Sequence, residues 1–543
     1  MSQAGELSGD RHVRRTRLFL LAIVTAFCLL YARTASYDFV WDDVDAIIHN
    51  PLYEGPWLTG LRASQHDHLD LSLRQQGLSR PMHDSYRPVL YASHRCERAL
   101  FGRSPVAHHL HNVVVALCAI GLAFALARRC LDDDAQALAV TAIFALHPLQ
   151  VEPIAYVSGR GDLLSACFAL ASLWLAMRAA ERTPELNARR ASWAALAALS
   201  YVLALLCKEA YVGLPLVLGL IAWSRGRLRF HVIDFTAQAL GLGLYLWVRL
   251  SMARSASSSS GIEGALLLPG LWLQYLRIML EPIDLSIVRP FDEHMRVPGW
   301  VALGALGALA LSVARKPLTP RTAALRRIVA GLLMALALIG PSAIVVRIMG
   351  VVADRYVYLP LFGFALALVV AFALLLTERP TLRLPLYATA SGCSLIWLAF
   401  TLVQIPVWRD PGTLYTHAAA IEPASERAVY GLASWYAHTG RCDRATPLFE
   451  RAIELDPRDG RAWNNLAVCA LNGGDYARAL VAAQNAISFA SAPPFRALYN
   501  EGLAYLRLGE ESQGCKALRR ALSINPAYQQ AAELSRRVCS VVP

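Results

Sequence analysis

Residues 17–32 read RLFLLAIVTAFCLLYA, an apolar run long enough to cross roughly 30 Å of hydrocarbon as a helix. Two more runs of this kind lie at 328–346 and 356–376. The first run follows four arginines and has no clean small-residue cleavage site after it, so we interpret it as an uncleaved anchor rather than a signal peptide. With 56% apolar residues and a mean hydropathy of +0.39, the chain is predicted to be a membrane protein with many helical spans.

Arginine-rich loops mark one side of the predicted membrane domain. They alternate with the apolar runs, as cytoplasmic loops of membrane proteins do, so the net charge of +12 does not indicate a nucleic-acid partner. The further predicted spans lie at 106–127, 136–150, 163–180, 192–207, 210–224, 233–250, 298–314 and 384–406. The arginine-rich loops lie at 128–129, 178–190, 225–229, 315–327 and 379–383.

These runs predict about eleven spans, with the N-terminus in the cytoplasm and the C-terminal region outside. Residues 265–280 (ALLLPGLWLQYLRIML) are apolar, but they contain a Pro-Gly break, and counting them as a span would place Arg315 and Lys316 outside. We therefore interpret 265–280 as re-entrant or interfacial. The expected location is a bacterial inner membrane with a periplasmic C-terminal region, or the ER membrane if the source is eukaryotic.

From about residue 408 the sequence becomes polar and repeats itself with a period near 34. Gly440, Gly474 and Gly509 take the same position in three successive repeats, which predicts tetratricopeptide (TPR) repeats after a half-repeat at 411–423. We thus expect an all-α chain: a polytopic membrane domain over 1–407, with a long outer loop at 34–105, and a TPR α-solenoid over 408–543. Stacked repeats offer a face for a ligand rather than a chemical centre, with structural capping of the membrane domain as the alternative.

Four of the 11 cysteines lie in the repeats. Cys442 and Cys469 stand on the second helix of one repeat and the first helix of the next. Cys515 and Cys539 stand in the same relation. This spacing predicts two disulfides, Cys442–Cys469 and Cys515–Cys539, formed in an oxidising compartment.

The predicted outer loop opens with YDFVWDDVDAIIHNP (37–51), in which Asp42 and Asp43 lie between aromatic and apolar residues just beyond the membrane edge. Such flanking residues indicate that the segment packs on the membrane domain. Because the two carboxylates repel each other, the pKa of one can be raised into the range of a general base. Metal binding by the pair, and a helix cap at Asp43 ahead of Val44–Ile48, are alternatives that the residues leave open.

Other predicted outer loops carry charged residues close to the membrane. A single Lys–Glu or Asp–Arg pair there is more often structural, although ionisable groups at membrane depth are usually functional. Several basic groups on one face with a carboxylate pair favour an anionic, lipid-linked ligand with a nucleophile activated nearby. The basic candidates are Arg87, Arg160, Lys208 and Arg355, and the other candidate site residues are His147, Glu152, Asp162 and Glu209.

Five segments of the chain resemble a known family. They are YDFVWDDVDAIIHNP, YRP (86–88), FALHPLQVEPIAYVSGRGDLLSA (144–166), CKEA (207–210) and DRYVYLPLFGF (354–364), and TPR repeats follow them. In this order they resemble the transmembrane and TPR repeat-containing O-mannosyltransferases and their bacterial relatives, which are similar to the wider GT-C glycosyltransferases. The resemblance implies a GT-C-like membrane domain, a polyprenyl-phosphate-linked sugar as donor, a Ser or Thr hydroxyl as acceptor, and inversion at the anomeric carbon.

The resemblance also implies roles for single residues. In such enzymes an acidic pair at the start of the first outer loop supplies the catalytic carboxylate, which makes Asp42 the expected base and lets Asp43 position the acceptor or its partner. The donor phosphate is expected to meet basic groups, and no metal or other cofactor is implied. The candidates for the phosphate are Arg87, Arg160, Lys208 and Arg355.

The resemblance leaves two points open. The donor sugar is mannose by resemblance, but glucose or another hexose fits equally. The repeat array is shorter than the arrays of the animal members, so the identity of the acceptor polypeptide does not follow. A non-catalytic membrane scaffold, or a lipid-binding receptor that uses the same face, is the alternative function. A transporter would need polar residues along several spans, whereas most spans here are Leu, Ala and Val.

Overall fold

The computed structural model describes residues 2–48, 50, 53, 55, 57, 86–182, 187–252, 260–490 and 493–539. Over these residues every regular element is a helix, as the sequence predicts. They divide into two compact units: a bundle of residues up to Asp43 and of Tyr86–Arg409, and a repeat unit from Asp410 on, with which the described residues between Val44 and Trp57 are grouped. Residues 58–85 of the predicted outer loop, and His49 and Pro51 of its opening motif, lie outside the described residues.

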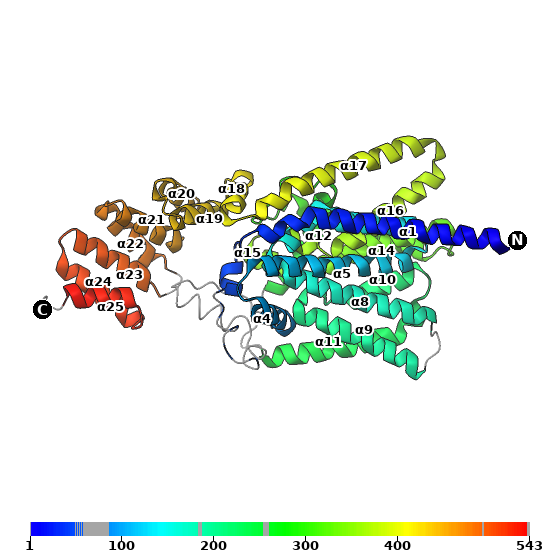
Figure 1. Cartoon of the computed structure of the whole chain (residues 1–543), viewed down its shortest axis with the longest axis horizontal. Helices are drawn as coiled ribbons and strands as arrows, with labels where there is room; N and C mark the ends of the chain where they lie inside the picture. The colour runs from blue at the N-terminus through cyan, green and yellow to red at the C-terminus, as the bar shows by residue number, and fades with distance from the viewer. Residues whose placement is uncertain are drawn as a thin grey trace. The chain divides into compact units, whose positions relative to one another are not determined.

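Long helices that run alongside one another form the bundle (Figure 1). They are α1 (Ser2–Tyr31), α5 (Pro105–Leu131), α6 (Asp134–Leu146), α8 (Arg160–Arg182), α9 (Ala188–Cys207), α10 (Leu214–Ser224), α11 (Val232–Met252), α13 (Arg296–Ala314), α14 (Pro320–Ile339), α16 (Pro360–Glu378) and α17 (Arg383–Gln404). Small residues let these helices approach closely: a Cβ at Gly331 of α14 would lie 2.5 Å from the Gly363 carbonyl oxygen of α16.

Local signals in the sequence set where several helices begin. The Asp133 carboxylate accepts a hydrogen bond from the Gln136 amide and caps α6. Thr319 and Thr322 form a reciprocal capping box at the start of α14. Proline occupies the first turn of α5 and α16, where it leaves no hydrogen bond unmade.

Among the described residues, eight helices are long and apolar enough to cross a membrane, or nine if α6 and the short helix α7 (Val151–Ala155), which meet at 54°, form one span. Eight or nine of the eleven predicted spans are thus supported. The other two predicted spans correspond to α10, which is short, and α11, which carries Asp234 and Arg249. The Asp234 carboxylate forms an ion pair with the Arg190 guanidinium of α9, so the acidic charge inside this predicted span is paired.

The segment predicted as re-entrant or interfacial forms α12 (Ser260–Leu280), which continues through Pro269. The prediction that Pro269-Gly270 breaks this segment was therefore wrong. The first turn of α12 pairs through Glu263 with Arg347, and its last turn accepts a hydrogen bond from His147 at the Met279 carbonyl, 3.0 Å away. Arg347 belongs to helix α15 (Ser342–Met349), and His147 follows α6 directly. The interfacial placement of α12 stays a prediction.

The repeat unit consists of α18 (Pro411–Ile421) and seven further helices. These are α19 (Glu426–His438), α20 (Cys442–Leu455), α21 (Gly460–Asn472), α22 (Tyr476–Ser488), α23 (Phe495–Arg507), α24 (Glu511–Ile524) and α25 (Gln529–Val538). The predicted frame is confirmed: Gly440, Gly474 and Gly509 end the first helix of each repeat with positive φ, between 77° and 86°. The predicted half-repeat is α18, which packs on α19.

Both predicted disulfides are present in the repeat unit. Cys442 of α20 pairs with Cys469 of α21, with their Cα atoms 5.3 Å apart. Cys515 of α24 pairs with Cys539 just after α25, with a Cα separation of 5.6 Å. The first bond joins two neighbouring repeats, and the second fastens the last helix.

Candidate active site

The acidic pair lies in the extended segment that follows α1 and the short 3-10 helix η1 (Ala32–Ser36). Trp41 has a φ of 53°, which is rare and strained for a bulky residue. Its ring stacks on the Tyr156 ring, with centroids 5.6 Å apart and planes at 25°. This turn separates the environments of the two residues that follow, Asp42 and Asp43.

Asp43 is completely buried. One carboxylate oxygen accepts hydrogen bonds from the Ser158 amide (2.7 Å) and hydroxyl (2.6 Å), and the other accepts from the Val40 amide (3.2 Å). Burial raises the pKa of Asp43 to about 7, against the opposing effect of these hydrogen bonds. The side chain therefore ties two segments together. These contacts do not make Asp43 a helix cap for Val44–Ile48, which was the alternative interpretation.

Asp42 is exposed. Its carboxylate accepts a hydrogen bond from the Tyr156 hydroxyl, 3.2 Å away. The two neighbours thus differ sharply: Asp42 can reach a substrate, whereas Asp43 cannot. Tyr156 itself is buried against Trp408 as well as Trp41, so it offers Asp42 a fixed partner.

Arg355 contacts the two aromatic rings that lie beside this pair. Its guanidinium carbon lies 5.2 Å from the centroid of the Trp41 ring and 5.9 Å from that of Tyr156. The buried Glu152 carboxylate accepts from both the Arg355 guanidinium (2.5 Å) and its backbone amide (3.1 Å). Glu152 therefore orients Arg355, whose side chain stays 18% exposed.

Tyr356 connects Arg355 to a second cation. Its ring centroid lies 5.2 Å from the Arg355 guanidinium and 5.1 Å from the Lys208 ammonium. The buried Asp162 carboxylate accepts from Lys208 at 2.5 Å. Burial lowers the pKa of Lys208, and the Asp162 charge opposes that shift. Lys208 follows α9 directly and is 12% exposed.

Arg87 is the third cation and stands immediately before helix α4 (Pro88–Phe101). Its guanidinium pairs with both oxygens of Glu209, at 3.1 and 2.9 Å. Burial opposes a raised pKa of Arg87, but the charge and hydrogen bonds of Glu209, and then the charge of Asp162, outweigh burial and raise it. The charges of Arg355 and Arg87 also lower the pKa of Lys208, so the three cations influence one another electrostatically. Each cation thus has a carboxylate partner and remains partly exposed.

Two of the predicted site residues do not join this cluster. Arg160 is completely buried, and its guanidinium donates to Asn112 and to the His108 carbonyl and contacts Glu97 and His94. The structure therefore places Arg160 in a buried network, apart from the three partly exposed cations, and its role toward a donor phosphate stays a prediction. His147 is also buried. One of its ring nitrogens forms a hydrogen bond with the Met279 carbonyl, and the other accepts a hydrogen bond from the Leu149 amide.

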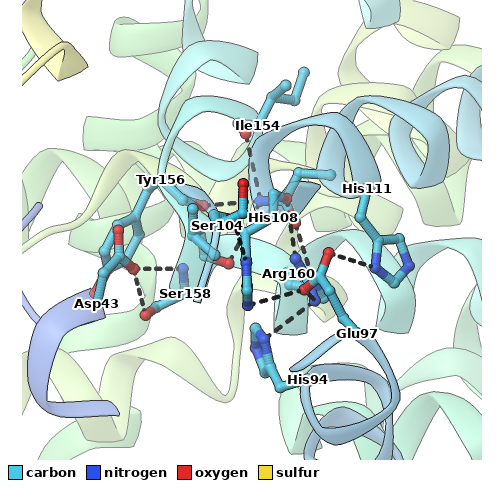
Figure 2. A network of polar contacts seen from close by, with 12 residues as sticks. Asp43, His94, Glu97, Ser104, His108, His111, Ile154, Tyr156, Ser158 and Arg160 are labelled. Carbon is cyan, nitrogen blue, oxygen red and sulfur yellow. Dashed lines mark hydrogen bonds and ion pairs between the residues drawn. The ribbon is translucent and has the colours of Figure 1, made fainter. Parts of the chain in front are cut away.

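One group of side chains has the composition of a metal site. Ligand atoms of His94, Glu97 and His108 lie within 4.8 Å of one another (Figure 2). However, the Arg160 guanidinium contacts both the Glu97 carboxylate and His94, so a cation already stands among these ligands. Adding a divalent ion beside a buried guanidinium would be opposed by charge repulsion in a low dielectric. The three side chains thus fit the role of partners for the Arg160 guanidinium rather than that of metal ligands.

Sequence reasoning missed the uncharged residues that join the charged ones. Trp41, Tyr156 and Tyr356 connect the acidic pair with Arg355 and Lys208 through ring contacts. Ser158 supplies two of the three hydrogen bonds to Asp43. A usable signal was present, since each aromatic residue stands within two positions of a predicted charged residue or lies in a quoted motif.

Comparison with known proteins identifies relatives of both units. Residues 430–494 and 495–528 match models of the tetratricopeptide repeat family. The chain is 34% identical over 195 residues to protein O-mannosyl-transferase Tmtc1 of Drosophila melanogaster, covering 35% of this chain and 21% of the relative. It is 29% identical over 307 residues to Drosophila Tmtc2 (52% and 32% covered).

A longer match is to the Caenorhabditis elegans protein O-mannosyl-transferase F38B6.6, 22% identical over 458 residues, which cover 81% of this chain and 63% of the relative. The chain thus spans less than two thirds of the length of each of these relatives. A solved structure, the TPR protein YrrB, is 18% identical and covers 31% of this chain and 98% of its own, with a TM-score of 0.22. The chain is thus a distant homologue of protein O-mannosyl-transferases, and its residues 430–528 match tetratricopeptide repeats.

Proposed function

We propose that the chain is a membrane glycosyltransferase that moves a hexose from a polyprenyl-phosphate donor to a Ser or Thr hydroxyl of a polypeptide. The observation that carries this proposal is the cluster itself: an exposed carboxylate, Asp42, on the same surface as three partly exposed cations. Homology to protein O-mannosyl-transferases supports the reaction class. Mannose is the sugar that the relatives' names suggest, and another hexose is compatible with the residues described above.

In this mechanism Asp42 is the catalytic base. It accepts the proton of the acceptor hydroxyl while the hydroxyl oxygen forms a bond to the anomeric carbon on the face opposite the phosphate. The bond from the anomeric carbon to the phosphate oxygen breaks, and its electron pair leaves on polyprenyl phosphate, so the anomeric configuration inverts. Asp43 positions the segment through Ser158 and Val40 rather than touching the substrate.

The cations have the complementary role. Arg87, Lys208 and Arg355 stabilise the negative charge that develops on the leaving phosphate, because they are held in place before the reaction by Glu209, Asp162 and Glu152. A carboxylate partner neutralises part of each positive charge in the resting site, and the donor phosphate neutralises the remainder. The TPR unit is proposed to hold the acceptor polypeptide, on the same side of the membrane as Asp42.

Sugar transfer tests this proposal directly. Membranes that contain the wild-type chain are expected to move radiolabelled hexose from a polyprenyl-phosphate donor to protein, and Asp42→Asn is expected to lose most of that activity. Equal activity in both proteins would remove Asp42 from the base role. Silence of both proteins across several sugars and acceptors, with donor binding retained, would favour a non-catalytic scaffold or lipid-binding receptor.

A further inference from the structure

Arg160, at the start of α8, is the centre of a buried polar network that does not contact the proposed reacting groups. Its Nε donates to the Asn112 side-chain oxygen at 2.9 Å, and its Nη2 donates to the His108 carbonyl at 3.0 Å. Its Nη1 contacts the Glu97 carboxylate and the His94 ring (Figure 2). All of these side chains are at most 4% exposed.

Asn112 of α5 links Arg160 to the connection between α6 and α8. Because its oxygen faces an obligate donor, Arg160, its amide group must point the other way. That amide group lies 3.0 Å from the Tyr156 carbonyl oxygen and 3.4 Å from each of the Ile154 and Val157 carbonyl oxygens. The two hydrogens of this buried amide group thus face three carbonyls of a single turn, with the Tyr156 carbonyl as the shortest contact.

The turn held by Asn112 is the one that meets the acidic pair. Tyr156 donates to Asp42 through its hydroxyl, and Ser158 donates to Asp43 through its amide and hydroxyl. The turn is also tight: a Cβ at Gly159 would lie 2.6 Å from the Pro153 carbonyl oxygen. The backbone carbonyls of this turn therefore face Asn112, and the hydroxyl and amide groups that bind the two acids belong to the same turn.

We infer that Asn112 and Arg160 are positioning residues for the acidic pair, acting through the 154–158 turn. This inference rests on the proposed function for its kinetic consequence, but its structural part stands apart from it. The network places no group on the substrate. It fixes Tyr156 and Ser158, which in turn fix Asp42 and Asp43.

Charge keeps the network intact. Burial alone would raise the pKa of Glu97, but hydrogen bonding by His111 and the charge of Arg160 outweigh burial and lower it, so Glu97 stays ionised. A buried guanidinium needs this partner, since an unpaired buried charge is costly. Glu97 lies on α4, whose first residue follows Arg87, so the Glu97–Arg160 pair also joins the helix after one proposed phosphate ligand to the turn behind the acids.

The geometry requires arginine at this position. Three directions are served at once: Asn112 from Nε, the His108 carbonyl from Nη2, and Glu97 with His94 from Nη1. A lysine ammonium keeps the charge but offers donors from one atom only. Arg160→Lys is therefore expected to retain the Glu97 pair and to release Asn112.

The test compares Asn112→Leu with a matched control, Gln238→Leu. Gln238 of α11 is equally buried and donates to the Ser172 hydroxyl at 3.2 Å, away from the turn. Hydrogen exchange is measured on the purified full chain in detergent. Asn112→Leu is expected to speed amide exchange in 38–43 and 154–160, and the control to leave both segments as in wild type.

The kinetic arm uses sugar transfer by the same proteins. Asn112→Leu is expected to lower kcat by roughly 10- to 100-fold, the scale of a displaced reacting group, with little change in the KM for the donor. Arg160→Lys is expected to give the same pattern, and it serves as the second variant should Asn112→Leu fail to fold. Unchanged exchange in 38–43 and 154–160, or the same loss of kcat in Gln238→Leu, would overturn the inference. A wild type without transfer activity would contradict the proposed function only, because exchange still decides the positioning role.

Discussion

At the scale of residues, the site depends on two neighbouring carboxylates with opposite surroundings. Asp42 is exposed beside a tyrosine hydroxyl, and Asp43 is buried beneath three hydrogen bonds. The strained turn at Trp41 directs the one outward and the other inward. A base must reach its substrate, so exposure rather than the raised pKa decides which of the two takes that role.

The raised pKa of Asp43 has a consequence for stability. With a pKa of about 7 in the folded chain and an ordinary value of 3.8, folding retains a proton between these pH values, so the contribution of Asp43 to stability falls as pH rises from about 4 to 7. Asp43→Asn removes this dependence. The difference in thermal midpoint, variant minus wild type, is expected to be more positive at pH 8 than at pH 5.

Asp38→Asn provides the control for that measurement. Asp38 is exposed in the same segment, so its variant is expected to give a midpoint difference that changes little with pH. A difference for Asp43→Asn that is equally flat from pH 5 to pH 8 would show that the folded carboxyl does not titrate near 7.

Residue types explain what sequence could and could not predict of the site. Charged residues next to apolar runs stand out, and ring contacts of Trp41, Tyr156 and Tyr356 do connect Asp42 with Arg355 and Lys208. The same reasoning did not foresee the burial of Arg160, because a charged residue near a membrane span can contact a ligand or a buried partner equally well. Asn112 carries no such signal, since its role depends on three carbonyls brought together only by the fold.

At the scale of elements, the strongest sequence signals gave the most accurate predictions. The 34-residue period placed the repeat helices and the glycine at the end of each first helix, and it placed four cysteines in pairs that do bond. Prolines were weaker guides. Pro269 was expected to break its segment but lies within α12, where Gly299 of α13 approaches so closely that a Cβ would meet the Pro269 carbonyl group at 2.4 Å.

The last helix of the repeat unit tests the second disulfide. Ala531 is the buried residue of α25, so this helix gains little from packing and depends on the bond from Cys539 to Cys515. A disulfide of this kind contributes about 2–4 kcal/mol. In Cys515→Ser, amides of α25 are expected to exchange faster by hydrogen-exchange mass spectrometry, while those of α19 keep their wild-type rates.

Cys393→Ser is the matched control, because Cys393 is an exposed free thiol of the bundle. It is expected to leave exchange in α25 unchanged. Equal exchange of α25 in wild type and Cys515→Ser would mean that the bond does not hold this helix.

At the scale of the whole molecule, the proposal needs the repeat unit and Asp42 on one side of the membrane. An odd number of crossings, such as the eleven predicted from the sequence, would give that arrangement with the N-terminus in the cytoplasm. Alkaline phosphatase, which is active only outside the cytoplasm, is expected to be active when fused after Pro543 in a bacterial host, and a fluorescent-protein fusion there to be dark. Truncated fusions at Arg227, in an arginine-rich loop, are expected to show the reverse. A fluorescent C-terminal fusion with inactive phosphatase would place the repeats across the membrane from Asp42.

Above all, we propose that Asp42 is the catalytic base beside a group of cations. The decisive measurement is the rate of hexose transfer from a polyprenyl-phosphate donor by purified Asp42→Asn, beside Asp38→Asn, with donor binding measured for both. We expect a loss of roughly 10²- to 10⁴-fold for Asp42→Asn, the contribution of a positioned base, with donor binding retained and Asp38→Asn near wild type. Transfer by Asp42→Asn at the rate of Asp38→Asn would contradict the claim.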